Sequence, residues 1–558
     1  MKKVLVLTLV FLMALSSVAL ASDNAHLVNT DPNSIAIATE LVELDILIRG
    51  NPAKYEAYEN WFWRFCEKEL NIKFNYEAVD SSVFTEKLNI IMSTDSMPDM
   101  IMASATIGNS SVLEWGQLDG MLLAIDEYRE YCPRYFAEVE KQPDLVLATT
   151  TPDGHTYGFG NIRVVVEGQS MGIPTGMNTK WLENLGMEMP TTLDEFYNVM
   201  MAFRTQDPNG SGDPTDEVPW QGLWSAGYPE RLPIYWAYGY NGYTWRTVNS
   251  TTLEGYYSPY VPEYKEIIGF LKQCWDDGIL QDTMFAISDG NEGRAFGMTN
   301  LDYTYYGFSI DNSNGPGLTG NPDFYCDWTP QIPLVVDETV KRTTWMGLPL
   351  DPFTWTISSS TEYPEVCVAF CDFWYDPYNA IMYCYGPEYG GAYDYDNCGW
   401  TYHEDTMAIT YDHIPESFTG TDIRDAWFSI MDGATFGLEG GTACRYYWPD
   451  QVERYGENWE GFDLHWQTGL AKNNTPYEMY DYISLLYYTP DDLEIYNTYR
   501  TPLWNYQTAQ EALFIVGDRD WSEFEAYQKE LDDMGGIIFD QFLDGKIDEF
   551  FGREVVVD

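Results

Sequence analysis

The chain has 558 residues, of which 45% are apolar and 21% charged, a composition typical of globular domains and not of disordered chains. It carries 87 Asp and Glu against 30 Lys and Arg, which gives a formal net charge of −57. A surface this negative repels phosphate backbones and anionic lipid head groups, so nucleic acid and membrane surfaces are excluded as partners.

The first residues have the pattern of a secretory signal peptide. Lys2 and Lys3 precede an apolar run over residues 4–15, and Ala19-Leu20-Ala21 forms a small-x-small cleavage site. Residues 1–21 therefore predict export, to a periplasm or to the cell surface. No cysteine lies near the cleavage site, so the sequence indicates no lipid anchor there.

Cysteine and histidine are too sparsely placed for a metal-based active site. The nine cysteines are widely spaced, and we leave open whether they are buried free thiols or disulfides. With five histidines and no zinc-like spacing, histidine-based metal catalysis is not expected.

Strands and helices alternate along the first part of the chain. We expect strands at 35–48, 72–79 and after Pro98, with helices at 55–70 and 83–92. This order predicts an α/β sheet with parallel strands. Later helices are expected at 192–200, with a Thr192–Glu195 capping box, and at 264–277, 364–375 and 521–534.

Several short segments stand in order along the chain: FTEKLN followed by SMPDMI (84–101), PDGHTYG (152–158), NTKWLENLG and PTTLDEF (178–196), and YGPE (385–388). Together they resemble the extracellular solute-binding proteins of bacterial ABC importers, in particular their large oligosaccharide-binding branch. The similarity spans much of residues 70–400, although Tyr389 stands where that family usually has glycine.

This resemblance implies a two-lobed α/β clamshell of the type II periplasmic-binding-protein kind, with a hinge. We place the first lobe at 22–165 with 350–395, and the second at 166–349 with 396–558. The family also implies a monomer without catalytic activity, which captures a carbohydrate and delivers it to the transmembrane subunits of an ABC permease.

A loop after the helix that starts at Leu193 has the spacing of a calcium site. Oxygen-bearing side chains at relative positions 1, 3 and 5, with glycine at 6, are the opening of an EF-hand-type loop. The acidic closure comes at positions 10 and 11 instead of 12. The alternative is an acid-rich Asn-Gly turn. The candidate ligands are Asp207, Asn209, Ser211, Asp213, Asp216 and Glu217.

Aromatic residues gather in stretches that we expect to be ordered loops. Flat rings stack on the C–H faces of sugars, and carboxylates accept hydrogen bonds from sugar hydroxyls. The net negative charge favours a neutral or cationic ligand. The candidate ligand-binding residues are Trp224, Trp245, Tyr303, Tyr305, Trp345, Trp355, Glu388, Tyr389 and Trp400.

The main alternative function is a secreted glycoside hydrolase, which needs a protonated carboxylic acid and a carboxylate on either side of the scissile bond. With 87 acidic residues such a pair can always be proposed, so their abundance does not support this reading. A surface glycan-binding adhesin would share the aromatic residues, but the α/β pattern argues against it.

Overall fold

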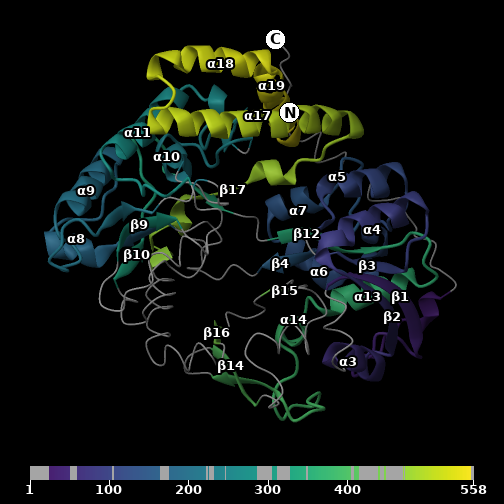
Figure 1. Cartoon of the computed structure of the whole chain (residues 1–558). Coiled ribbons are helices and arrows are strands. Elements are labelled where there is room, and N and C mark those ends of the chain that lie inside the picture. The colour runs from purple at the N-terminus through teal and green to yellow at the C-terminus, as the bar shows by residue number, and fades with distance from the viewer. Residues whose placement is uncertain are drawn as a thin grey trace, which may run out of the picture. The chain divides into compact units, whose positions relative to one another are not determined.

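The protein, seen here as a computed structural model, separates into two compact units that interleave along the chain (Figure 1). Unit 1 comprises 1–164, 349–450 and 487–489, and unit 2 comprises 165–348, 451–486 and 490–558. Residues 396–450, which we expected in the second lobe, thus belong to unit 1. The structure describes 24–50, 60–103, 106–163, 175–221, 224, 231–245, 247–285, 305–310, 327–346, 350–403, 408–413, 438–439, 445–447, 469–470 and 472–553.

A six-stranded mixed sheet forms the centre of unit 1, in the order β15-β4-β12-β3-β1-β2. Three strands run parallel, as the sequence predicted: β1 (Val42–Arg49), β2 (Ile72–Val79) and β3 (Met100–Met102). β12 (Leu350–Ile357) returns from far along the chain and lies antiparallel to both β3 and β4 (Phe159–Arg163). β15 (Leu438–Glu439) closes the far edge, parallel to β4.

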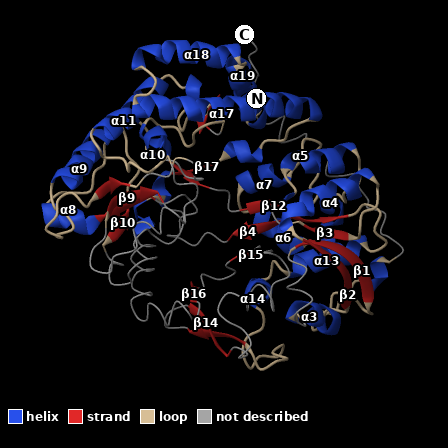
Figure 2. Cartoon of the chain, viewed as in Figure 1, coloured by secondary structure: helices blue, strands red, loops and turns tan. Residues whose placement is uncertain are grey.

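Helices cover both faces of this sheet, with α4 on one side and α13 on the other (Figure 2). Asp80 caps α4 by accepting a hydrogen bond from the Ser82 amide, which fixes the start of that helix. The principal helices of unit 1 are α3 (Trp61–Glu69), α4 (Ser81–Ser93), α5 (Asn109–Val112), α6 (Pro133–Val139), α7 (Pro143–Thr149), α13 (Pro364–Phe373) and α14 (Pro377–Tyr385).

A separate three-stranded sheet in unit 1 has the order β13-β14-β16. Its strands are β13 (Gly399–His403), β14 (Ala408–His413) and β16 (Arg445–Tyr447).

Unit 2 is built on a four-stranded sheet in the order β10-β5-β9-β6. β6 (Val218–Trp220) and β9 (Tyr306–Ile310) are parallel, and β5 (Thr175–Asn178) runs antiparallel to β9 and to β10 (Trp328–Pro330). Two small ladders add β7 (Thr247–Val248) with β8 (Gly255–Tyr256), and β11 (Thr344–Met346) with β17 (Glu478–Tyr480).

The helices of unit 2 surround a large aromatic core. The Thr192–Glu195 capping box at the start of α9 is confirmed. The sequence analysis predicted α9, α11 and α18 but missed the other helices of unit 2, among them α17, which contains Pro502, and α19, which starts directly after Gly535. The helices are α8 (Thr179–Leu185), α9 (Leu193–Thr205), α10 (Arg231–Ala237), α11 (Tyr264–Asp276), α17 (Pro490–Val516), α18 (Phe524–Asp533) and α19 (Gly536–Phe550).

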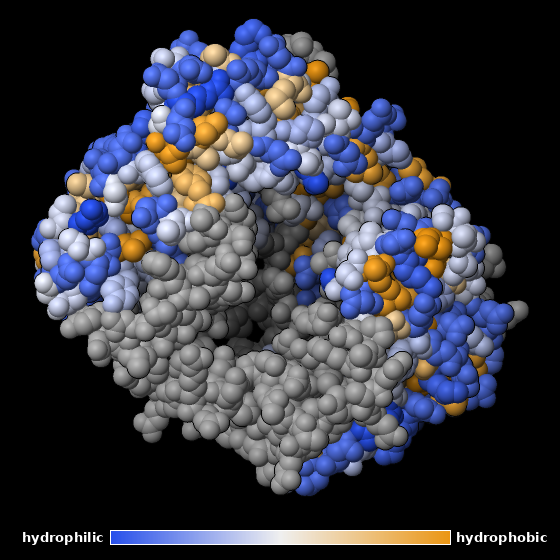
Figure 3. Space-filling view, in the orientation of Figure 1, coloured by the Kyte–Doolittle hydropathy of each residue, from blue (hydrophilic) through white to orange (hydrophobic). Residues whose placement is uncertain are grey.

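On the face shown in Figure 3, the described surface is mainly hydrophilic, with small apolar patches scattered over it. Exposed apolar side chains include Val83 and Ile90 on α4 and Ile538 on α19. Within the described ranges, no helix has the length and hydrophobicity needed to span a bilayer. The predicted signal peptide lies outside those ranges.

A carboxylate on α19 generates a pH-dependent prediction. Asp540 accepts a hydrogen bond from the Tyr257 amide (2.8 Å), and its burial raises its pKa to about 7. Because this pKa is higher in the folded than in the unfolded chain, folding becomes less favourable as the pH rises from about 4 to 7. We expect Asp540→Asn to raise the free energy of unfolding by about 1 kcal/mol at pH 8 and to change little at pH 4, as measured by urea denaturation.

Asp533→Asn is the matched control, because the Asp533 side chain is exposed on α18 and pairs with Lys529 in solvent. Its effect should be small at both pH values. An Asp540→Asn variant that is equally or less stable than the wild type at pH 8 would contradict the prediction.

Candidate functional site

The predicted calcium loop lies in unit 2, between the end of α9 and the start of β6. Its turns are held by its own side chains. The Gly212 amide donates to Asp207 Oδ2 (2.9 Å), the Ser211 amide donates to Asn209 Oδ1 (2.8 Å), and Asn209 Nδ2 donates to Asp216 Oδ1 (2.8 Å). Gly210 has a φ of 73°, a left-handed conformation that glycine adopts without strain. The chain therefore makes the sharp turn that the spacing predicted.

Glu217 is the unusual group in this loop. Its side chain is buried, and neither carboxylate oxygen has a hydrogen-bond partner; Asp207 Oδ1 is also buried without one. Burial, together with the negative charges of Asp216, Asp207 and Asp213, raises the pKa of Glu217 to about 7. Buried carboxylate oxygens without donors fit a site for a hard cation, which would supply the missing positive charge.

The carboxylates alone do not make up a complete metal site. In the part of the chain that the structure describes, no three His, Cys, Asp or Glu side chains are gathered as metal ligands. The Asp213 carboxylate accepts from the Thr215 amide (3.1 Å) and hydroxyl (2.6 Å). A calcium ion here would therefore also need neutral oxygens, such as those of Asn209, Ser211 and main-chain carbonyls.

Three of the predicted ligand-binding residues come together in unit 1: Glu388, Tyr389 and Trp400. The Tyr389 amide donates to the Trp400 carbonyl (2.8 Å), and the Trp400 amide donates to the Pro387 carbonyl (3.1 Å). Gly399 permits this close approach, since a Cβ there would lie 2.2 Å from the Pro387 carbonyl oxygen.

The Trp400 side chain packs inside this loop and is buried. It is 4% exposed, and its Nε1 donates to the Gly386 carbonyl (2.8 Å). The expectation that its ring stacks on a ligand is therefore corrected, because the indole is buried against the loop.

Tyr378 belongs to the same cluster and was missed by the sequence analysis. It is 42% exposed, and its hydroxyl donates to Glu388 Oε2 at 3.4 Å. Its ring centroid lies 6.3 Å from that of Trp400. Position 378 is at the start of α14, ten residues before Glu388, and no motif marked it. Tyr378, Glu388 and Tyr389 together are hereafter called the tyrosine cluster.

Trp355 is a core residue, which corrects its prediction as a ligand platform. It lies in β12 with no exposed surface, and its ring stacks on Phe370 of α13 at 5.4 Å between centroids. A ring already packed on the helix that covers the sheet cannot offer that face to a sugar.

Trp224 in unit 2 is also buried, at 5% exposure. The ring of Phe285 lies 5.1 Å from its ring centroid, and the Arg231 guanidinium lies 4.0 Å from it. Arg231 is itself buried and forms an ion pair with Glu511 on α17. The expectation that Trp224 faces a ligand is corrected for this structure, because Arg231 and Phe285 cover its ring.

The remaining aromatic candidates of unit 2 keep some exposed surface. Trp245 is half-buried, with the ring of Trp504 at 5.6 Å and the Arg500 guanidinium at 5.2 Å. Trp345 in β11 is half-buried, as is Tyr305, whose carbonyl accepts from the Val218 amide (2.8 Å). Tyr303 lies outside the described residues.

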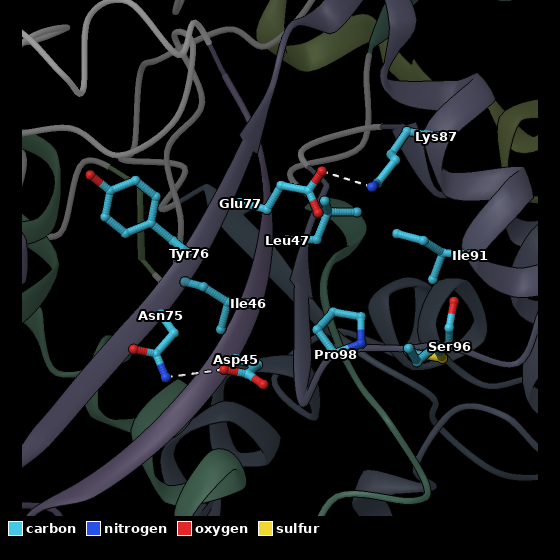
Figure 4. Close-up of a pocket in the computed structure, with 11 residues that line it drawn as sticks. Asp45, Ile46, Leu47, Asn75, Tyr76, Glu77, Lys87, Ile91, Ser96 and Pro98 are labelled. Carbon is cyan, nitrogen blue, oxygen red and sulfur yellow. Dashed lines mark hydrogen bonds and ion pairs between the residues drawn. The ribbon is translucent and has the colours of Figure 1, made fainter.

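A pocket of about 510 Å³ in unit 1 lies between β1, β2, α4 and the segment before β3 (Figure 4). Lys87 pairs with Glu77 (2.7 Å) and Asn75 donates to Asp45 (3.1 Å) on its walls. Pro98 lines it from the amino-terminal side of β3. Ligands of parallel α/β sheets bind at the opposite, carboxyl edge, so we do not assign the carbohydrate to this pocket.

Comparisons with known proteins place these features in context. No family model matches the sequence. The chain is 24% identical over 480 residues to the fructooligosaccharide ABC transporter substrate-binding protein FusA of Streptococcus pneumoniae, covering 84% of this chain and 83% of FusA. The chain is a relative of the substrate-binding proteins of ABC transporters.

Solved structures agree on the fold. An HMO-binding solute-binding protein of Bifidobacterium longum infantis matches with a TM-score of 0.67 and 17% identity, over 92% of this chain and all of that one. FusA in complex with kestose matches with a TM-score of 0.62 and 20% identity, also over 92% of this chain and all of that one. The predicted α/β solute-binding-protein fold is confirmed.

The distinction between core and surface rings can be tested by truncation. We expect Trp355→Ala to lower the free energy of unfolding by about 3–5 kcal/mol, because it removes a fully buried ring. Tyr389→Ala should lower it by less than about 1 kcal/mol, because this side chain is only partly buried. Urea denaturation of both variants measures the difference. Equal losses would show that Tyr389 is a core residue.

Proposed function

We propose that this protein is an exported receptor that captures a neutral oligosaccharide and delivers it to an ABC importer without altering it. The observation that carries the proposal is the near full-length similarity to FusA, a fructooligosaccharide-binding protein. The relatives are binding proteins and not enzymes, so the glycoside hydrolase alternative is not favoured.

The tyrosine cluster is the surface of unit 1 that suits a sugar best. It combines exposed ring surface from Tyr378 with the carboxylate of Glu388 and the partly exposed Tyr389. Rings can stack on the C–H face of a pyranose or furanose, while Glu388 accepts from its hydroxyls. In unit 2, the half-buried rings of Tyr305, Trp245 and Trp345 are the corresponding candidates.

Capture would follow from the two-unit architecture. The chain passes between the units several times, as expected for lobes joined by a hinge. A ligand that touches both units only when they are closed favours the closed state by its differential affinity. The ligand-loaded monomer would then dock on the transmembrane subunits of its permease, and the predicted signal peptide would deliver it outside the cytoplasm.

We further propose a structural calcium ion in the 207–217 loop. The candidate ligands are those predicted, with Asp207, Asn209, Ser211 and the Asp213 carbonyl at the opening and Asp216 or Glu217 at the closure. The unpartnered oxygens of Glu217 and Asp207 support it. A solved structure of an EF-hand mutant of FusA has a similar fold, with a TM-score of 0.62, so an EF-hand occurs in a relative. The ion would neutralise buried charge and fix the start of β6.

Ligand class can be measured by thermal shift and calorimetry with kestose, lacto-N-tetraose and trigalacturonate. We expect stabilisation by at least one neutral sugar and none by the anionic one, because the chain is strongly negative. Tyr389→Ala should weaken binding about tenfold through lost stacking.

Tyr76→Ala is the control for Tyr389→Ala. Tyr76 is 39% exposed and stacks on Trp63 away from the tyrosine cluster, so its loss should not change affinity. Recovery of shortened sugars after incubation would contradict a pure binding role. Binding of none of the neutral sugars would contradict the proposed function.

Calcium removal provides an independent test. Adding calcium to chelator-treated protein should raise the melting temperature, because the ion binds only the folded loop. Glu217→Gln should abolish this response and should also stabilise the calcium-free protein, since it removes an unpaired buried charge.

Glu188→Gln is the control for Glu217→Gln, because Glu188 lies in the same unit but outside the loop. It should keep the calcium response. A wild-type melting temperature that is the same with calcium and with chelator would rule out the ion.

A further inference from the structure

The sheet of unit 2 has an edge that is suited to ligand binding. β6 and β9 run parallel with Trp220 opposite Phe308, and Leu280 forms a parallel bridge to Trp220 on the other side. The carboxyl ends of three neighbouring segments therefore meet at one edge. In α/β sheets, ligands bind beyond this edge.

The next residue of each segment carries a neutral hydrogen-bonding side chain: Gln281, Gln221 and Ser309. The ladder continues through them, since the Gln281 amide donates to the Trp220 carbonyl and the Gln221 amide to the Phe308 carbonyl, both at 3.0 Å. Because they share one level of a parallel sheet, their side chains share one face. We call these three residues the amide row.

The amide row is buried, and its side chains are held in defined orientations. Gln281 is 3% exposed, Gln221 5% and Ser309 fully buried. Ser309 Oγ donates to Gln221 Oε1, and Gln281 Nε2 donates to Thr283 Oγ1 (2.9 Å). The bond from Ser309 occupies the oxygen end of the Gln221 amide, and the Tyr306 hydroxyl interacts with the side chains of Gln221 and Gln281. With one hydrogen of the Gln221 NH₂ group directed to Tyr306, the other is the donor for a further acceptor.

From this geometry we propose that Gln221 is a ligand-contact residue that donates to a hydroxyl oxygen of the saccharide, and that Ser309 is its positioning residue. The inference rests on the proposed function and adds that this edge of the sheet selects neutral over anionic sugars. The amide row has no formal charge, and exposed Asp282 follows it directly. A carboxylate on the ligand would meet no cation within the amide row and would be repelled by Asp282, so the row favours neutral sugars.

The size of the expected loss in ligand affinity follows from the burial of Gln221. A hydrogen bond made in a water-poor site discriminates strongly, because a ligand without the matching group leaves a buried donor unpaired. Removing the Gln221 amide should thus reduce affinity by about tenfold or more, whereas removing the Ser309 hydroxyl should reduce it less, because Ser309 acts through Gln221.

Gln331 supplies a matched control within the same sheet. It is also a buried glutamine, 1% exposed, and follows β10 directly. Its amide pairs with Thr175, one level beyond Ser309, so its side chain lies on the opposite face of the sheet. Its Nε2 donates to the Pro190 carbonyl (2.7 Å), which indicates a purely structural role.

The experiment compares Gln221→Met, Ser309→Ala and Gln331→Met by calorimetry with kestose and lacto-N-tetraose. We expect a loss of tenfold or more for Gln221→Met and a smaller loss for Ser309→Ala, while Gln331→Met stays within twofold of the wild type. In the double variant, Ser309→Ala should add nothing to Gln221→Met, because its effect passes through that amide. Trigalacturonate should not bind the wild type.

The outcomes separate the two proposals. If the wild type binds neither neutral sugar, the proposed function fails. If the wild type binds and Gln221→Met binds equally well, or if Gln331→Met weakens binding as much, only the assignment of Gln221 fails. Should Gln221→Met not fold, Gln221→Glu keeps the size and polarity of the side chain while replacing its donor by an acceptor. It should bind at least tenfold more weakly, and unchanged binding would overturn the assignment.

Discussion

The pairing of β12 with β3 and β4 is the constraint on which unit 1 depends. β12 enters the sheet more than 180 residues after β4 and fills the gap between it and β3. Without this strand the parallel β1–β3 ladder and β4 would not form one sheet. The burial of Trp355 against Phe370 anchors the same strand to α13. The chain between β4 and β12 belongs to unit 2, so the two units are interleaved along the sequence.

A protein with this excess of acidic residues must supply hydrogen-bond donors or cations to the carboxylates that it buries. Glu511 is wholly buried and accepts from Tyr264 (2.9 Å) and Gln507 (2.7 Å) as well as pairing with Arg231. Asp372 caps α6 through the Tyr135 amide (2.9 Å) and pairs with Arg134. Glu217 is the contrasting case, because it is buried with neither oxygen bonded. That contrast is why the 207–217 loop fits a cation, although its acidic side chains are not gathered as a complete set.

The surfaces that suit a sugar differ in kind between the two units. In unit 1, the tyrosine cluster offers ring surface beside a carboxylate. In unit 2, the amide row offers neutral donors and acceptors at a sheet edge. Ring stacking contributes affinity that depends little on where the sugar hydroxyls lie. Hydrogen bonds to buried amides depend on the position of individual hydroxyls.

The sequence by itself determined the local structure and the family resemblance. The β2 strand, the capping box of α9 and the sharp turn at Gly210 depend on neighbouring residues, so they could be predicted. The helix α17 was missed because Pro502 and its mixed polarity hide a helix that only packing stabilises. Tertiary structure alone decided which rings are core and which remain exposed. The sequence predicted three buried tryptophans as ligand-binding residues. In the structure, Trp355 packs on Phe370, Trp224 lies under the Arg231 guanidinium, and Trp400 donates to the Gly386 carbonyl. No motif marked Gln221, because the orientation of its side chain depends on a hydrogen bond from Ser309, 88 residues further along the chain. The burial of a side chain is set by partners distant in sequence, and a single sequence does not specify them.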